Sequence, residues 1–112
     1  MARFGLATVR GRSMQPTLVD GDRLLVRYGA VPDAGDLVVV RLPADAAGAP
    51  RPLAVKRAAH AEPDGWWVER DNPAEGVDSW SVGVVLHRDV VAVVVARVWP
   101  VWPVAARRRV PD

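Results

Sequence analysis

The sequence contains no cysteine and no isoleucine, and Lys56 is its only lysine beside 14 arginines. The absence of cysteine excludes disulfides, thiol catalysis and cysteine-ligated metals. The two histidines, His60 and His87, lack metal-ligand spacing to each other or to a carboxylate, so neither a metal site nor a cofactor is predicted. The hydroxyl side chains that could act as nucleophiles are Thr8, Ser13, Thr17, Ser79 and Ser81. A histidine-activated serine remains formally possible, but the candidate chemistry narrows to serine with lysine.

The contrast between one lysine and many arginines has a chemical meaning. Arginine stays protonated at any pH a protein meets, whereas a desolvated lysine can give up its proton. A shortage of lysine, asparagine and isoleucine together is typical of GC-rich coding. Lys56 is therefore a candidate for a position that arginine cannot serve, although drift alone could also leave one lysine.

Length and charge indicate one small globular domain. The chain has 112 residues, of which 50% are hydrophobic and 25% charged, with a net charge of +2. This length is enough to bury a hydrophobic core. Arg107–Arg109 supply more than the whole net charge, so no broad basic face for nucleic acid is expected. We predict a domain over residues 1–104 and a basic, solvated tail over residues 105–112.

No targeting or membrane-spanning segment is apparent in the sequence. The first ten residues have no apolar stretch of the length a signal peptide needs. The most apolar stretch, residues 90–104, contains Arg97 and two prolines and is shorter than the ~20 residues of a spanning helix. We predict a soluble, cytoplasmic protein without stable membrane insertion.

Short valine-rich segments separated by glycine, proline and aspartate favour β-strands, and no window shows a sustained helical period. The fold class is therefore expected to be all-β, with little or no helix and an antiparallel sheet curled into a barrel or sandwich. Residues 43–50 are expected to form a loop or hairpin tip. The predicted strands cover residues 5–10, 22–28, 36–42, 53–59, 66–70, 82–87 and 90–99.

Strand alternation makes a prediction for Lys56. In an extended segment Lys56 shares one face with Ala54 and Ala58, while Arg57 points to the opposite face. The two alanines leave room for a long side chain against apolar surface. The pattern therefore permits Lys56 to face inward while Arg57 stays in water, but it does not prove that the lysine is buried.

Ser13 lies in a turn-rich stretch between the first two predicted strands. Gly11 allows unusual backbone angles there, and Pro16 fixes the path just beyond the serine. Such a turn can hold a nucleophile clear of the surface with its amide N–H free to bind an oxyanion. On residue types alone, an ordinary surface serine in a turn is the more common case.

Four motifs, in order along the chain, resemble the S26 (type I signal peptidase-like) family of serine–lysine peptidases. Residues 13–18 (SMQPTL) resemble its serine motif, and residues 35–40 (GDLVVV) resemble its Gly-Asp strand. Lys56-Arg57 resembles its lysine motif, and Asp71-Asn72 with Asp78-Ser79 resembles its final motif. Gly-Asp before a strand is common, but four blocks in order are a specific signal.

The resemblance implies an endopeptidase in which Ser13 attacks the scissile carbonyl and neutral Lys56 takes its proton. This role needs a lysine pKa lowered from about 10.4 by burial. The Ser13 amide would form one arm of the oxyanion hole, and Met14 and Pro16 would shape the site. Asp78 and Ser79 would brace the core behind the lysine. The full supporting set implied by these motifs is Arg57, Asp71, Asn72, Asp78 and Ser79.

Some positions depart from the family pattern. Some relatives place an oxyanion-binding serine at the position of Gly11, and many place a serine near the lysine at the position of Gly76. Arg70 stands where glycine is usual, and Trp80 replaces an arginine that usually pairs with the aspartate. Asp78 therefore needs another partner, for which Arg57 is a candidate.

Within this family the chain most resembles the soluble maturation proteases of nickel-type superoxide dismutase, a likeness to which the tryptophan-rich segments 66–67 and 99–103 contribute. The implied partner is the superoxide dismutase proprotein, from which a short N-terminal propeptide is removed. Nickel then belongs to the substrate. The alternatives are signal peptidase-like processing of exported preproteins, a repressor-type self-cleaving domain, and a non-catalytic barrel that binds peptides by strand addition. Self-cleavage would need a cleavable segment before Ser13, for which twelve residues leave little room.

Overall fold

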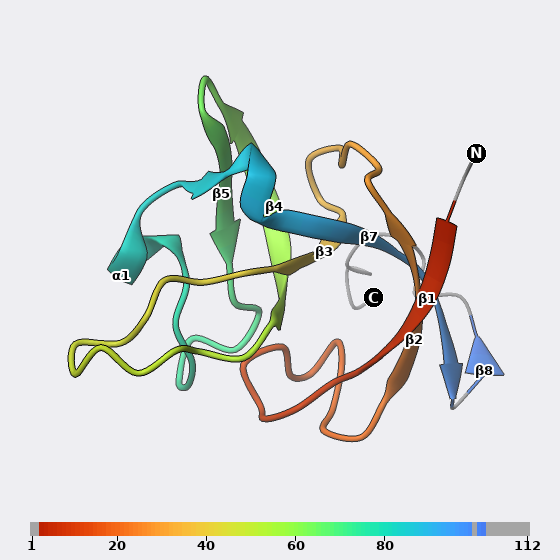
Figure 1. The fold of residues 1–112 in the computed structure, drawn as a ribbon. Helices are drawn as coiled ribbons and strands as arrows, with labels where there is room; N and C mark the ends of the chain where they lie inside the picture. The colour runs from red at the N-terminus through yellow and green to blue at the C-terminus, as the bar shows by residue number, and fades with distance from the viewer. Residues whose placement is uncertain (1–2, 100, 103–112) are drawn as a thin grey trace.

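The computed structural model describes residues 3–99 and 101–102, which form one curled antiparallel sheet (Figure 1). The strand order is β1-β2-β7-β3-β4-β5-β6, and β8 pairs with β7 beside this path. The sheet bends into a half-barrel, with β1 and β2 on one side and β4 and β5 on the other. The strands are β1 (Arg3–Thr8), β2 (Arg23–Tyr28), β3 (Leu37–Val40), β4 (Ala54–Glu62), β5 (Gly65–Glu69), β6 (Val85–Leu86), β7 (Val90–Trp99) and β8 (Val101–Trp102).

The central strand β3 is buried on both of its faces. Leu37 and Val39 belong to one hydrophobic cluster, whereas Val38 and Val40 belong to the other. A strand covered on both sides needs apolar residues at every position, which explains its uninterrupted valine run. The first cluster joins β2, β3 and β7 to Met14 and Leu18 of the loop after β1. The second joins β3, β4, β5 and β6.

The only helices among the described residues are a four-residue helix α1 (Ser79–Val82) and a 3₁₀ turn (His87–Asp89). Asp78 caps α1 by accepting a hydrogen bond from the Trp80 N–H. The helix ends at Gly83, whose positive φ of 81° favours glycine.

The predicted fold class is confirmed, because the structure is nearly all-β and antiparallel. Residues 43–50 form a loop as expected. The strand predicted over residues 82–87 is wrong at both ends, since Val82 ends α1 and His87 begins the 3₁₀ turn. The Asp78 cap and the Gly83 stop explain that difference, because they favour a helical turn before the short β6.

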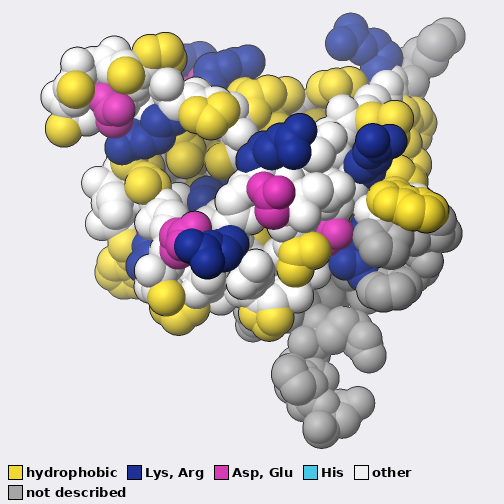
Figure 2. Space-filling model, turned by 90° about the horizontal axis from the view of Figure 1, so that it is seen from below, with side chains coloured by type: hydrophobic (Ala, Val, Ile, Leu, Met, Phe, Trp, Pro, Cys, Tyr) yellow, Lys and Arg dark blue, Asp and Glu magenta, His cyan; other side chains and the backbone are white. Residues whose placement is uncertain are grey.

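Figure 2 shows one face of the molecule, on which basic side chains lie interspersed with acidic and apolar ones and do not gather in one patch. In the part of the chain that the structure describes, no helix is long and apolar enough to cross a membrane. The predicted basic tail, residues 105–112, lies outside the described residues, as does part of the tryptophan-rich segment 99–103.

Candidate active site

Ser13 is presented by a turn between β1 and β2 that is anchored from below. Met14 is only 2% exposed and Leu18 only 1%, and both belong to the first hydrophobic cluster. Two backbone hydrogen bonds tighten the turn, from the Gln15 N–H to the Arg12 carbonyl at 3.1 Å and from the Leu18 N–H to the Met14 carbonyl at 2.9 Å. Because its neighbour Met14 points into the core, the partly exposed Ser13 is held at the surface.

Lys56 lies on β4 and points inward, as the strand pattern permits. Its side chain shares the face of Ala58, in the second cluster, and of Ala54, which packs against that cluster. The residue is 3% exposed, and its cross-strand partner is the buried Val38. Lys56 Nζ donates a hydrogen bond to Ser13 Oγ at 2.9 Å. The structure thus brings together two side chains that are 43 residues apart in the sequence.

The environment of Lys56 disfavours its charged form. Burial lowers the pKa of Lys56 below its ordinary value of 10.5, because the ammonium loses its hydration. The carboxylate of Asp78 opposes this by raising the pKa, and the guanidinium of Arg70 lowers it further. The net direction, downward, is the one that a lysine base requires.

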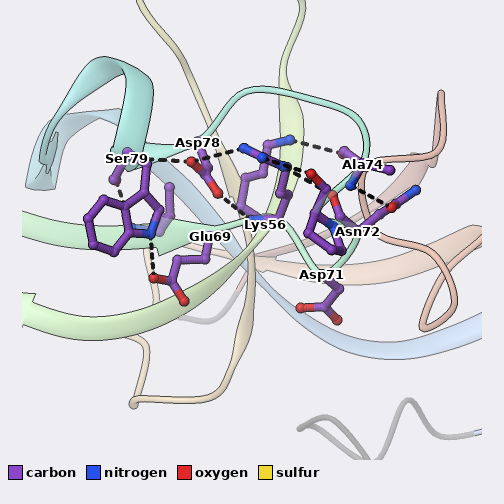
Figure 3. A network of polar contacts seen from close by, with 12 residues as sticks. Lys56, Glu69, Asp71, Asn72, Ala74, Asp78 and Ser79 are labelled. Carbon is purple, nitrogen blue, oxygen red and sulfur yellow. Dashed lines mark hydrogen bonds and ion pairs between the residues drawn. The ribbon is translucent and has the colours of Figure 1, made fainter.

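The segment from Arg70 to Asp78 is hydrogen-bonded to the serine turn through Asn72. The Asn72 backbone N–H donates to the Ser13 carbonyl at 2.8 Å, and Asn72 Nδ2 donates to the Arg12 carbonyl at 2.8 Å. In Figure 3, Asp78 lies on one side of Lys56 and Asn72 on the other. The predicted supporting residues Asn72 and Asp78 therefore surround the Ser13–Lys56 contact.

Asp71 fastens the same turn to β4. The Thr17 hydroxyl donates to Asp71 Oδ2 at 2.6 Å, and the Asp71 backbone N–H contacts Met14 Sδ at 3.4 Å. Arg57 Nη2 reaches the same carboxylate oxygen at 2.7 Å. Asp71 thus links the serine turn to the residue that follows Lys56.

Arg57 is not in water, so that prediction is wrong. Its residue exposure is 6%, and besides Asp71 it binds the Gly35 carbonyl at 2.8 Å. Lys56 and Arg57 lie on opposite faces of β4, as strand alternation predicted. Alternation cannot show, however, whether other segments of the chain cover both of these faces. The second face is occupied by the Asp71 carboxylate, which pairs with the guanidinium.

Asp78 does have a cationic partner, but this partner is Arg70 and not the predicted Arg57. Arg70 Nη1 lies 3.4 Å from Asp78 Oδ1, and the Arg70 backbone N–H donates to Asp78 Oδ2 at 3.0 Å. Trp80, which stands where an arginine was expected, is 74% exposed, and its Nε1 donates to Glu69 Oε2 at 2.9 Å. Arg70 therefore supplies the charge that position 80 lacks.

Ser79 and Pro16 contribute differently. The Ser79 side chain is buried at 1% exposure, and its Oγ accepts a hydrogen bond of 2.8 Å from the Val68 N–H, which ties the start of α1 to β5. Pro16 is exposed and follows a cis peptide bond after Gln15. Ser79 braces the second cluster, whereas Pro16 only shapes the path of the serine turn.

Beside Ser13 and Lys56 lies an open cleft of about 220 Å³. Its lining includes residues 52–55 together with Arg12 and Glu75, which form an ion pair at 3.1 Å. The Ser13 N–H makes no hydrogen bond to any residue within 3–99 and 101–102, so this donor is available. Across that same range, no group of three or more histidine or acidic side chains is placed to hold a metal.

Residues 2–83 match the Peptidase S24-like family, and the chain belongs to this family. This assignment confirms the coarser part of the sequence prediction, a peptidase family of the serine hydrolase type, and the matched region includes both Ser13 and Lys56. The search of curated proteins gave no match.

Sequence reasoning missed three contributors to the site. For Thr17, the sequence offers no signal beyond its place in the serine motif. The Arg12–Glu75 pair was missed because its side chains are 63 residues apart in the sequence. Arg70 was visible only as a departure from the family pattern. An arginine directly before Asp71-Asn72, combined with the missing arginine at position 80, was the signal that could have identified it.

Proposed function

We propose that this protein is a serine–lysine endopeptidase in which Ser13 is the nucleophile and Lys56 the general base. The observation that carries the proposal is the 2.9 Å contact between Lys56 Nζ and Ser13 Oγ, at a lysine whose pKa is lowered by burial. The distance lies within the ~2.6–3.2 Å reach of a proton-transferring pair.

In the proposed mechanism, the substrate lies in the cleft with its scissile carbonyl against Ser13 Oγ. Neutral Lys56 takes the hydroxyl proton as the oxygen attacks, giving a tetrahedral oxyanion and an ammonium group. The ammonium then protonates the leaving amine, and the peptide C–N bond breaks to leave an acyl-serine. Lys56 next deprotonates a water molecule that attacks the ester, and the ammonium so formed returns the proton to Ser13 Oγ as the ester C–O bond breaks, which restores both side chains.

The oxyanion needs donors aimed at it, and the Ser13 N–H is the candidate that this chain offers. Gly11 cannot replace the serine hydroxyl of some relatives, and its own N–H is already bonded to Asp20 Oδ1 at 2.7 Å. We therefore expect oxyanion binding to depend on the main chain at Ser13 rather than on a side chain at position 11.

For the substrate we propose a protein precursor that loses a short N-terminal propeptide, most specifically the proprotein of nickel superoxide dismutase. The chemistry rests on the site, whereas this substrate rests on the sequence resemblance. Signal peptidase-like processing of exported preproteins and a non-catalytic peptide-binding barrel are the alternatives. A repressor-type self-cleaving domain is a further alternative, which would need a cleavable segment bound in the cleft, whereas Arg3–Thr8 are paired with β2.

The decisive experiment is intact-mass analysis of a nickel superoxide dismutase precursor co-expressed with wild type, Ser13→Ala or Lys56→Arg. We expect a short N-terminal peptide to be lost with wild type only, because a guanidinium cannot serve as the base. Cleavage by the Lys56→Arg variant would refute the dyad.

A matched control is Arg41→Lys, which changes an exposed arginine away from the cleft and should leave cleavage intact. A precursor left whole by the wild type would discard this substrate, and exported preproteins would be tested next. The mass of the peptidase itself, read in the same spectra, reports any self-cleavage.

A further inference from the structure

Arg70 holds both ends of the loop that leads from β5 to α1. Its Nε donates to the Asn72 carbonyl and its Nη2 to the Pro73 carbonyl, both at 3.0 Å. Its Nη1 lies 3.4 Å from the Asp78 carboxylate. A planar guanidinium can serve two carbonyls and a carboxylate at once, which a single ammonium cannot do with the same geometry.

The loop that Arg70 holds is in direct contact with the nucleophile. Asn72 donates both of its hydrogen bonds to the backbone of Arg12 and Ser13. At the other end of the loop, a Cβ added to Gly76 would lie 2.4 Å from Ser13 Cβ, so the main chain passes directly against the serine side chain. Any movement of this loop would therefore move Ser13 or open space beside it.

Arg70 also occupies the carboxylate next to the lysine. Asp78 is 2% exposed, and its oxygens accept from the N–H groups of Trp80 and Arg70 and pair with the Arg70 guanidinium. Lys56 directs its hydrogen bond to Ser13 Oγ. A buried carboxylate that lost its guanidinium would be a strong competitor for the ammonium form of Lys56.

We propose that Arg70 is a positioning residue for the serine–lysine pair: it fixes the loop of residues 72–76 against Ser13 and occupies Asp78, so that Lys56 stays bonded to Ser13. This inference rests on the function proposed above. It assigns a role to the one arginine that departs from the family pattern at the start of the final motif.

The electrostatics agree with this geometry. Among the charged groups near Lys56, Arg70 lowers its pKa and Asp78 raises it, while Arg12 and Glu75 at the cleft rim pair with each other. Loss of the Arg70 charge removes one lowering influence and leaves the Asp78 carboxylate uncompensated. The pKa of Lys56 should then rise, and more of the side chain should be protonated at neutral pH.

The test exploits the single lysine of the chain. Protein labelled with ¹³Cε-lysine gives one side-chain resonance, which reports the titration of Lys56 without a substrate. We would compare wild type, Arg70→Gln, Arg70→Lys and the control Arg41→Gln. Like Arg70, Arg41 uses its guanidinium to bind a carbonyl and a carboxylate, those of Arg88 and Asp89.

We expect the Lys56 titration midpoint to move to higher pH in Arg70→Gln, to return toward the wild-type value in Arg70→Lys, and to stay unchanged in Arg41→Gln. When cleavage of a precursor is measured against pH, the rise of kcat/KM on the acid side of the profile (its acid limb) should likewise move to higher pH in Arg70→Gln. A merely structural role would lower kcat/KM at every pH without moving this limb.

An unchanged midpoint in folded Arg70→Gln would overturn the inference. If that variant does not fold, the same titration is made in Arg70→Met, which keeps the length of the side chain but removes its charge, and an unchanged Lys56 midpoint in folded Arg70→Met would equally overturn the inference. Failure of the proposed function would be recognised differently. In that case the wild-type protein would cut no precursor, whatever the titration midpoint of Lys56.

Discussion

The contact between Gly76 and Ser13 gives the sharpest quantitative prediction. Gly76 has a φ of +107°, and a Cβ at this position would lie 2.4 Å from Ser13 Cβ. Ser13 Cβ is attached directly to the main chain and cannot rotate away, so a larger residue must displace either the loop or the serine turn. Gly76→Ser restores the residue that many relatives have near the lysine, yet here we expect it to destabilise the protein.

The expected loss has two parts. A non-glycine residue at a strained positive φ costs about 1–3 kcal/mol. Overpacking a contact that cannot relax freely costs about a further 1–3 kcal/mol. We therefore expect Gly76→Ala and Gly76→Ser to lower the free energy of unfolding by about 2–6 kcal/mol, a large share of the ~5–15 kcal/mol typical of a folded domain.

Gly48 provides the matched control. Its φ is +85°, but no atom lies within 4 Å of an added Cβ, so Gly48→Ala should show the backbone cost alone. Urea unfolding followed by tryptophan fluorescence gives the free energy of unfolding of each variant. Unchanged slopes of this free energy against urea concentration would show that the folded and unfolded states of the variants remain comparable. Equal losses in the two alanine variants would refute the close contact between this loop and Ser13.

Three further predictions concern the buried charges. The kcat/KM of cleavage should rise with pH and level off below pH 10.5, because the lowered pKa of Lys56 makes the neutral amine available at a lower pH than in an ordinary lysine. A kcat/KM that falls with pH over this range would contradict the lysine base. Lys56→Met should be more stable than wild type at neutral pH in urea unfolding. This advantage should vanish above pH 10.5, since the cost of burying the ammonium is full below the folded-state pKa and disappears as both states become neutral. Arg57→Ala should lower the free energy of unfolding by about 3–5 kcal/mol, because it removes this cation from the buried, 3%-exposed Asp71 carboxylate. The control Arg41→Ala, which breaks an exposed ion pair, should lower the free energy of unfolding by no more than about 1 kcal/mol.

Much of the sheet could be predicted because its strands are locally encoded. Valine-rich segments between glycine, proline and aspartate gave six of the strands nearly in place. Strand alternation together with the small neighbours Ala54 and Ala58 permitted an inward-facing Lys56, and its 3% exposure agrees with this. The segment around residues 79–87 was harder, since a one-turn helix there depends on the Asp78 cap and not on any repeating apolar pattern.

The partners of the buried charges could not be predicted in the same way. Whether Arg57 lies in water or in the core depends on whether another segment crosses its face, and Asp71 arrives there from a loop 14 residues later. Asp78 pairs instead within its own loop, with Arg70 eight residues earlier, and this pairing depends on how the loop folds back. Strand alternation carries no information about either ion pair. The catalytic roles of Ser13 and Lys56 remain predictions for the experiments above.

The strand order has a consequence for how the molecule is made. The hairpin of β1 and β2 carries Ser13 and the pair of β3 and β4 carries Lys56, and within the sheet the two pairs are joined through β7. Such pairings between distant segments form slowly, and β7 is synthesised after the strands β2 and β3 that it joins. A nascent chain that has not yet folded β7 into place lacks the strand that joins its two halves. The timing of synthesis thus delays assembly of the Ser13–Lys56 contact until nearly the whole sheet exists, and a half-made copy is expected to be unable to cut.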